Sequence, residues 1–266
     1  MKLIRSGVVA LALVMSSAAF AAEPGCSPSG EDFRYSWRLT GGARFLAGLV
    51  FPTSGAANLR TSFPQGADAA IRSELLITSP NGRQGGFYSY ESDIERRANR
   101  TLITSHGYAW GSKSRHERAV LDYEKGLARL EKKTPEGGVE NRVKKLPEGD
   151  RQLRDMLTAI WYLRQESPRI TGPVQTNIYS SGKEYPVIFR PLERRSFEVG
   201  GKATMARGFE IVGAPGGKKK WPGGVKVWIS EDDRRTPVRI EISQGLAALQ
   251  LDLRSVEACS LIARLQ

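Results

Sequence analysis

Two histidines and two cysteines have the widest choice of chemistry in this chain. His106 and His116 lie in a segment rich in serine, glycine and arginine, whereas Cys26 and Cys259 lie towards the two ends. Catalysis needs a nucleophile, a base or a metal held by supporting groups, yet the chain has no G-x-S-x-G nucleophile elbow and no phosphate-binding P-loop. We therefore expect solvated surface roles for both histidines and no catalytic residue.

The residue types also disfavour a metal or cofactor site. A zinc site takes three or four nitrogen and sulfur ligands, which two histidines and two mutually paired cysteines cannot supply. Glu231, Asp232 and Asp233 offer an alternative, since calcium binds carboxylate oxygens. Consecutive residues cannot all point at one ion, however, and Arg234 and Arg235 follow directly. We expect a charged hairpin turn at this cluster, and no bound metal or cofactor.

The tryptophans offer an apolar binding surface. On the inside of a curved sheet, the tryptophans would line an apolar groove suited to a lipid or a hydrophobic peptide. The candidates are Trp37, Trp110, Trp161, Trp221 and Trp228, of which we favour Trp37, Trp161 and Trp228. The helix that carries Trp161 would then act as a lid. The alternative is that these large side chains build the core and its rim. The sequence leaves both interpretations open.

The first 21 residues have the pattern of a secretory signal peptide. Lys2 and Arg5 form a basic region, an apolar run follows, and Ala19-Phe20-Ala21 is an A-x-A cleavage site. The apolar run is shorter than the roughly 20 residues that cross a bilayer, and no later segment reaches that length. We expect residues 1–21 to be removed, and residues 22–266 to form a single β-rich periplasmic domain without a transmembrane segment.

Export gives the two cysteines a structural meaning. An even number of cysteines in an oxidising compartment indicates a disulfide, so we expect Cys26 to pair with Cys259. The bond requires the first and last strands to come together, as they do when a curved sheet closes or nearly closes. Two separate buried thiols are the alternative.

The chain is strongly basic, with a formal net charge of +12 over 266 residues. Such a surface attracts anionic lipid, lipopolysaccharide, glycan or nucleic acid, although solubility alone also explains it. The one dense basic run, Lys218-Lys219-Lys220, lies in a loop rich in glycine and proline. Because no basic helix or nucleic-acid motif accompanies it, we expect no nucleic-acid partner and keep an anionic envelope component as an alternative partner.

Alternation of apolar and polar residues predicts most of the secondary structure. Residues 225–229, 238–243 and 247–254 alternate strictly and predict an antiparallel meander. Residues 115–133 suit either a strand pair or a helix. Weaker alternation predicts further strands at residues 33–39, 73–78, 86–90, 185–189, 196–199 and 204–212.

One segment is clearly helical, because Met156, Ile160 and Leu163 recur at helical spacing. Asp150 can cap its N-terminus and Pro168 ends it. We expect this helix to cover the sheet and to divide an N-terminal set of strands from a C-terminal set. The predicted fold class is mainly β: a curved antiparallel sheet or partly closed β-barrel with one amphipathic helix packed on it.

Two segments resemble the DUF3108 family of exported bacterial proteins. One is the helical run at residues 156–164; the other, more specific, is residues 227–242, in which a strand with Trp228 and an acidic-basic turn precede Pro237-Val238-Arg239-Ile240. The resemblance is firm over about 100 residues and loose over most of the chain after the signal, and residues 41–86 depart most from it. It implies an exported β fold and supplies no catalytic residues. The layout is also similar to that of periplasmic lipoprotein carriers of the LolA and LolB kind, as a fold analogy alone.

These observations favour a non-enzymatic periplasmic protein that binds an apolar or lipid-like ligand on a curved sheet. The alternative is an envelope structural or assembly factor that acts through its basic surface on polysaccharide or a protein partner. A hydrolase is the least favoured class, because the residues that it needs are missing.

Overall fold

The computed structural model describes residues 30–41, 52–66, 69–79, 86–110, 113–134, 137–146, 152–216, 221, 223–244 and 247–258. The expected signal peptide, Cys26, Cys259, Asp150 and the run 218–220 lie outside these ranges. Within them, no helix is both long and apolar enough to cross a membrane.

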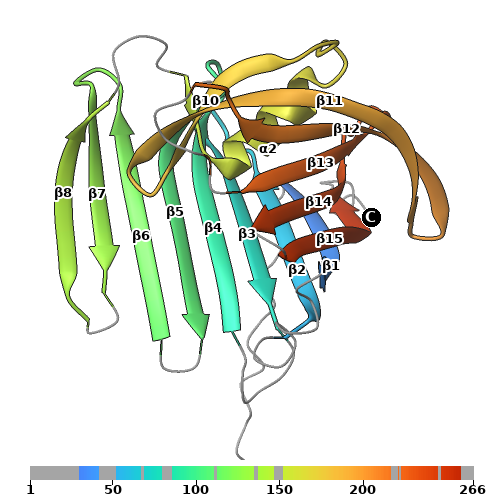
Figure 1. Ribbon diagram of the computed structural model, residues 1–266, viewed down its shortest axis with the longest axis horizontal. Helices are drawn as coiled ribbons and strands as arrows, with labels where there is room; N and C mark the ends of the chain where they lie inside the picture. Colours follow the sequence, from blue (N-terminus) through green and yellow to red (C-terminus); the bar gives the residue numbers. More distant parts are fainter. Residues whose placement is uncertain are drawn as a thin grey trace, which may run out of the picture.

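The described residues form one long, curved sheet and one helix (Figure 1). An N-terminal half-sheet runs from β1 to β8, and a C-terminal half-sheet runs from β9 to β15, with α2 between β9 and β10. The N-terminal half-sheet comprises β1 (Gly30–Thr40), β2 (Ser54–Ser62), β3 (Ile71–Thr78), β4 (Gly86–Glu95), β5 (Arg100–Trp110), β6 (Lys113–Asp122), β7 (Leu127–Lys133) and β8 (Val139–Lys145). The C-terminal half-sheet, with the helix that follows its first strand, comprises β9 (Leu153–Arg154), α2 (Met156–Glu166), β10 (Val174–Ser180), β11 (Lys183–Val199), β12 (Lys202–Gly213), β13 (Gly224–Ser230), β14 (Pro237–Gln244) and β15 (Ala247–Ala258).

The two half-sheets are joined through the first and last strands of the chain. Within each half, strands that follow one another in the chain are neighbours and pair antiparallel, except that the short β9 pairs with β10 in parallel. The first strand, β1, pairs with β15 in antiparallel register from Glu31↔Ala258 to Thr40↔Ala248. The strand order ends with β8 on one side and β9 on the other, so the sheet is curved but unclosed. The predicted mainly β fold with one helix is confirmed. The terminal strands meet in the middle of the sheet, however, and not through closure of its edges.

Every predicted strand lies within an observed one, and the segments 185–189 and 196–199 are parts of the single strand β11. One open alternative is now decided, and one expectation needs correction. Residues 115–133 form the β6–β7 hairpin and not a helix. The N-cap of α2 is Asp155 and not Asp150, because the Asp155 carboxylate accepts a hydrogen bond from the Thr158 N–H at 2.8 Å. The two residues before Asp155 pair with β10 in parallel, which holds them out of the helix.

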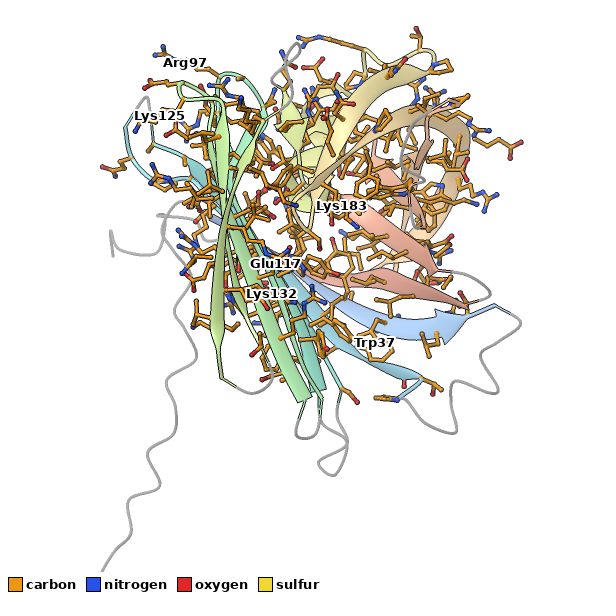
Figure 2. The ribbon with its side chains drawn as sticks, turned by 60° about the vertical axis from the view of Figure 1, so that its left-hand side comes forward. Trp37, Arg97, Glu117, Lys125, Lys132 and Lys183 are labelled. Atoms are coloured by element: carbon orange, nitrogen blue, oxygen red, sulfur yellow. The ribbon has the colours of Figure 1, made fainter. Side chains whose placement is uncertain are left out.

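The helix fills the space between the half-sheets at one end. Its buried residues include Leu157, Ile160 and Leu163, which belong to one apolar core with Phe33 of β1 and Phe189 of β11. Side chains from both half-sheets fill the interior (Figure 2). A second, smaller core lies under β9 and β10 on the outer strands of the N-terminal half-sheet; it contains Ala119, Leu121, Tyr123, Ala128, Leu130, Leu146, Leu153 and Tyr179.

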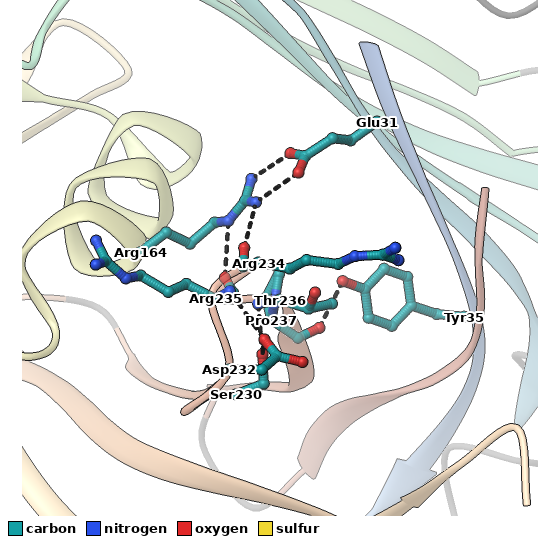
Figure 3. Close-up of polar contacts among 9 residues, drawn as sticks. All are labelled: Glu31, Tyr35, Arg164, Ser230, Asp232, Arg234, Arg235, Thr236 and Pro237. Carbon is teal, nitrogen blue, oxygen red and sulfur yellow. Dashed lines mark hydrogen bonds and ion pairs between the residues drawn. The ribbon is translucent and has the colours of Figure 1, made fainter. Parts of the chain in front are cut away.

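Arg164, in the last turn of α2, ties the helix to both half-sheets (Figure 3). The Arg164 side chain is only 5% exposed, and its Nη1 lies 2.8 Å from Oε2 of Glu31 on β1. Its Nε and Nη2 donate to the carbonyls of Arg235 and Arg234, at 2.9 and 3.1 Å, in the β13–β14 turn. We call this set the Arg164 latch, and its turn belongs to the acidic-basic segment that the sequence singled out.

Two acidic residues of that turn bond to different parts of the protein. Asp232 Oδ1 accepts from the Ser230 hydroxyl at 2.7 Å and from the Arg235 N–H at 3.1 Å. Glu231 pairs instead with Arg194 of β11, at 2.7 Å. The carboxylates therefore diverge, and no group of three or more potential metal ligands occurs in the part of the chain that the structure describes. The segment forms the charged hairpin turn expected from its sequence.

Candidate functional site

A pocket lies where the N-terminus of α2 meets the inner faces of both half-sheets. It encloses about 200 Å³ and is partly open to solvent. Sites for drug-sized ligands typically measure about 300–1,000 Å³, so this pocket suits a small group or one part of a larger ligand. Its lining comprises Tyr90, Thr104, His106, Asp155, Met156, Leu157, Ile178, Tyr179, Ser180, Ser181, Trp221, Gly223, Val225, Ile242 and Ser243.

The C-terminal half-sheet supplies the apolar wall of the pocket. Ile178 lies on β10, Val225 on β13 and Ile242 on β14, and Trp221 precedes β13. The Trp221 ring packs edge-on against Tyr185, with 5.4 Å between ring centroids. This packing holds the tryptophan against the sheet, so the wall is preformed.

His106 marks the polar end of the pocket. Its ring stacks on Tyr90 at 6.2 Å between centroids, and its Nε2 lies 3.4 Å from the Ser181 hydroxyl and 4.0 Å from Glu117 Oε2. Burial lowers the pKa of His106 below its ordinary value; nearby Glu117 opposes this shift and Arg115 adds to it. The imidazole is therefore neutral at pH 7 and can donate or accept a hydrogen bond.

The β10–β11 turn closes the polar end against the N-terminal half-sheet. Ser181 and Gly182 both have positive φ, +48° and +68°, as a tight two-residue hairpin turn requires. The Lys144 ammonium donates to the Gly182 carbonyl at 3.0 Å, and a side chain at Gly182 would collide with Leu130. The β10–β11 turn of the C-terminal half-sheet thus contacts β7 and β8 of the N-terminal half-sheet, with which it forms no strand pairing.

Asp155 forms the floor of the pocket at the start of α2. The carboxyl is fully buried, and this burial raises its pKa, opposed by hydrogen bonds from the Thr158 backbone and from hydroxyl groups that include Thr104. The Thr158 hydroxyl also bonds those of Ser92 and Thr101, at 2.9 and 2.8 Å. This network fixes the first turn of α2 on β4 and β5.

The three tryptophans favoured for a groove do not line this pocket. Trp37 and Trp228 are buried in the main core, where Trp37 Nε1 donates to the Thr78 carbonyl at 2.7 Å. Trp161 is half-buried on α2, with its ring 5.6 Å from that of Phe63. Trp221, one of the other two candidates, lines the pocket. Nothing in its sequence setting distinguished it from the other four.

The two histidines lie on opposite faces of the N-terminal half-sheet. His106 faces the pocket. Ser105 precedes His106 on β5, so its side chain points to the opposite face. His116 lies on that opposite face, because its Nε2 is 2.8 Å from the Ser105 hydroxyl. Sequence reasoning gave both histidines a surface role and overlooked Asp155 and Tyr90. The lining residues come from strands far apart in the chain, so no local motif joins them.

Comparisons with solved structures show the fold. A β-barrel-like protein of the DUF1849 domain from Brucella abortus superposes with a TM-score of 0.56 at 6% identity, covering 87% of this chain and 98% of its own. A second match is a structure from Vibrio parahaemolyticus described as a "putative outer membrane lipoprotein-sorting protein domain". It is 10% identical, and the match covers 87% of this chain and 86% of that chain. Its TM-score is only 0.26, too low to relate the folds. No sequence match is found among curated proteins.

A family model identifies the chain itself. The model described as "Protein of unknown function (DUF3108)" matches residues 56–254, from β2 to β15. The match includes α2 and the β13–β14 turn, the two segments on which the resemblance was based. It also includes every residue of the pocket lining. The chain therefore belongs to the DUF3108 family.

Proposed function

We propose that this protein is a non-enzymatic periplasmic binding protein that takes an apolar or lipid-like group into the pocket between its half-sheets. The observation that carries the proposal is the preformed apolar wall of Ile178, Trp221, Val225 and Ile242 opposite a small polar end. An apolar pocket with few polar groups is the usual form of a small-molecule site. The signal-peptide pattern at residues 1–21 supports the periplasmic location.

The polar end suits recognition better than catalysis. Ser181 and His106 lie 3.4 Å apart, but a hydrolase also needs a group that orients the histidine from its other ring nitrogen. Glu117 approaches the same Nε2 that faces Ser181. We therefore assign these side chains to the binding of a polar group at one end of the ligand.

The test is a fluorescence titration with the apolar dye N-phenyl-1-naphthylamine. The wild-type protein should bind the dye with increased emission. Ile242→Trp fills the pocket and should weaken binding at least about tenfold, equivalent to about 1.4 kcal/mol. Trp221→Ala, which removes one wall, should also weaken it.

Leu76→Trp is the matched control, because Leu76 is 44% exposed on the outer face of β3. It adds the same side chain away from the pocket and should leave dye affinity unchanged. Thermal unfolding of each variant checks that it is folded. Equal affinity of folded Ile242→Trp and wild type for the dye would refute the proposed site.

A further inference from the structure

A row of side chains leads from the pocket to the outer strands of the N-terminal half-sheet. In the strand register, Tyr90 of β4 lies opposite His106 of β5, and His106 lies opposite Glu117 of β6. Glu117 in turn lies opposite Lys132 of β7. Directly opposite residues of antiparallel strands share one face of a sheet, and neighbouring strands are about 4.8 Å apart. Lys132 therefore lies on the pocket face, about 10 Å across the sheet from His106.

The β10–β11 turn brings a second lysine to the same place. Ser181 contacts His106, and Gly182 packs on Leu130, two residues before Lys132 on the same face of β7. Lys183 follows directly and is exposed. Glu117, Lys132 and Lys183 lie along the space between the half-sheets, whereas Lys125 and Arg97 lie at a far end of the N-terminal half-sheet (Figure 2).

The charges of this region do not balance. Glu117 pairs with Arg115 at 3.0 Å, and Glu140, opposite Lys132 on β8, pairs with Arg142 at 3.1 Å.

In this region, Lys132, Lys144 and Lys183 have no carboxylate within 4.0 Å among the described residues, and the same holds for Lys133, Lys145 and Lys202 elsewhere on the protein. Lys144 already donates to the Gly182 carbonyl. Glu184, beside Lys183, points to the other face of its strand, because successive side chains alternate. A local excess of positive charge thus borders the polar end of the pocket, where His106 is neutral.

We infer that the ligand is an anionic amphiphile, whose apolar part enters the pocket and whose phosphate or carboxylate is bound by Lys132 and Lys183. The inference rests on the proposed function, because the pocket must first accept an apolar group. Lysine is a compact point charge on a flexible stem, and it binds such anions without requiring one fixed geometry. Ser181 and His106 supply hydrogen bonds between the charged head and the apolar part.

The test measures displacement of N-phenyl-1-naphthylamine from the full exported protein by three probes. Dodecyl phosphate carries the proposed head group, dodecyl maltoside is a neutral amphiphile of equal chain length, and inorganic phosphate is the anion alone. Dodecyl phosphate should displace the dye at about tenfold lower concentration than dodecyl maltoside, equivalent to about 1.4 kcal/mol. Added salt should reduce this preference, because it screens exposed charges.

Lysine variants locate the effect. Lys132→Ala and Lys183→Ala should each reduce the preference for dodecyl phosphate, and the double variant should abolish it with dodecyl maltoside affinity unchanged. Lys125→Ala is the matched control, since Lys125 is exposed and distant from the pocket. It removes one positive charge and should retain the full preference.

The outcomes separate the two proposals. A wild-type protein that binds neither dye nor amphiphile would refute the proposed function itself. Dye binding with equal displacement by the two amphiphiles, unaffected by the lysine variants, would refute the anionic head group and leave the proposed function standing. Competition by inorganic phosphate as strong as that of dodecyl phosphate would assign the lysines to free phosphate and overturn the amphiphile.

Discussion

Replacing Arg164 with methionine should destabilise the protein by about 3–5 kcal/mol, the usual cost of leaving one partner of a buried ion pair alone. The Arg164 side chain is 5% exposed and its guanidinium contacts Glu31 and two backbone carbonyls. Methionine keeps the apolar stem but removes every one of these contacts. For a chain of this size, 1 kcal/mol corresponds to roughly 2–4 °C in Tm, so we expect a fall of roughly 6–20 °C.

Urea unfolding followed by circular dichroism measures this loss directly. Glu31→Gln should cost less than Arg164→Met, because Glu31 is partly exposed and glutamine can still accept from Arg164. The double variant should cost less than the sum of the single variants, since both remove the same ion pair.

Arg169→Ala is the control for a generic effect of removing an arginine beside α2. Its side chain is 79% exposed and pairs with Glu166 at 3.1 Å, and such surface pairs contribute about 0–1 kcal/mol. If Arg164→Met loses no more stability than Arg169→Ala, the latch does not hold the helix and the reasoning fails.

Three further predictions concern the two ends of the pocket and the termini. Because burial raises the pKa of Asp155, its ionisation costs stability as pH rises through the folded-state pKa. Asp155→Asn, which can still cap α2, should therefore be at least as stable as wild type at pH 7, and Asp155→Ala should lose about 0.5–2 kcal/mol of capping, both measured by urea unfolding. Because burial lowers the pKa of His106, the folded protein binds the proton less readily than the unfolded chain, and stability falls as pH drops below the ordinary value of about 6.5. His106→Gln should show a shallower loss of urea midpoint from pH 7 to pH 5, and an equally steep loss would contradict this. Non-reducing peptide mapping of the exported protein should recover Cys26 linked to Cys259; two freely alkylated thiols would remove the disulfide.

Strand identity was predictable because half-buried strands have a two-residue period. In β13 and β14, Val225, Val227 and Ile240 are buried as their alternation predicts. The pairing of β1 with β15 was harder to foresee in detail, because it depends on contacts between the two ends of the chain. The expected cysteine pair required the first and last strands to meet. They do meet, but as central neighbours of an unclosed sheet.

The candidate site was less predictable than the fold. Its side chains come from β4, β5, β10, β13, β14 and the start of α2, and no pattern within one segment relates His106 to Trp221. The tryptophans were candidates by residue type alone. By residue type, Trp37 and Trp228 were as good candidates as Trp221, yet their side chains are buried in the core. Only the curvature of the sheet decides which aromatic side chain faces a pocket and which one fills the interior.

The position of α2 connects stability to binding. The Arg164 latch fixes the C-terminal end of the helix to β1 and the β13–β14 turn, and the hydroxyl network around Asp155 fixes its N-terminal end to β4 and β5. The pocket floor is the N-terminal end itself, so both sets of contacts determine its shape before any ligand arrives. A preformed site avoids the cost of ordering side chains and loops on binding. Two polar anchor points on one short helix therefore serve an apolar pocket that neither half-sheet could form alone.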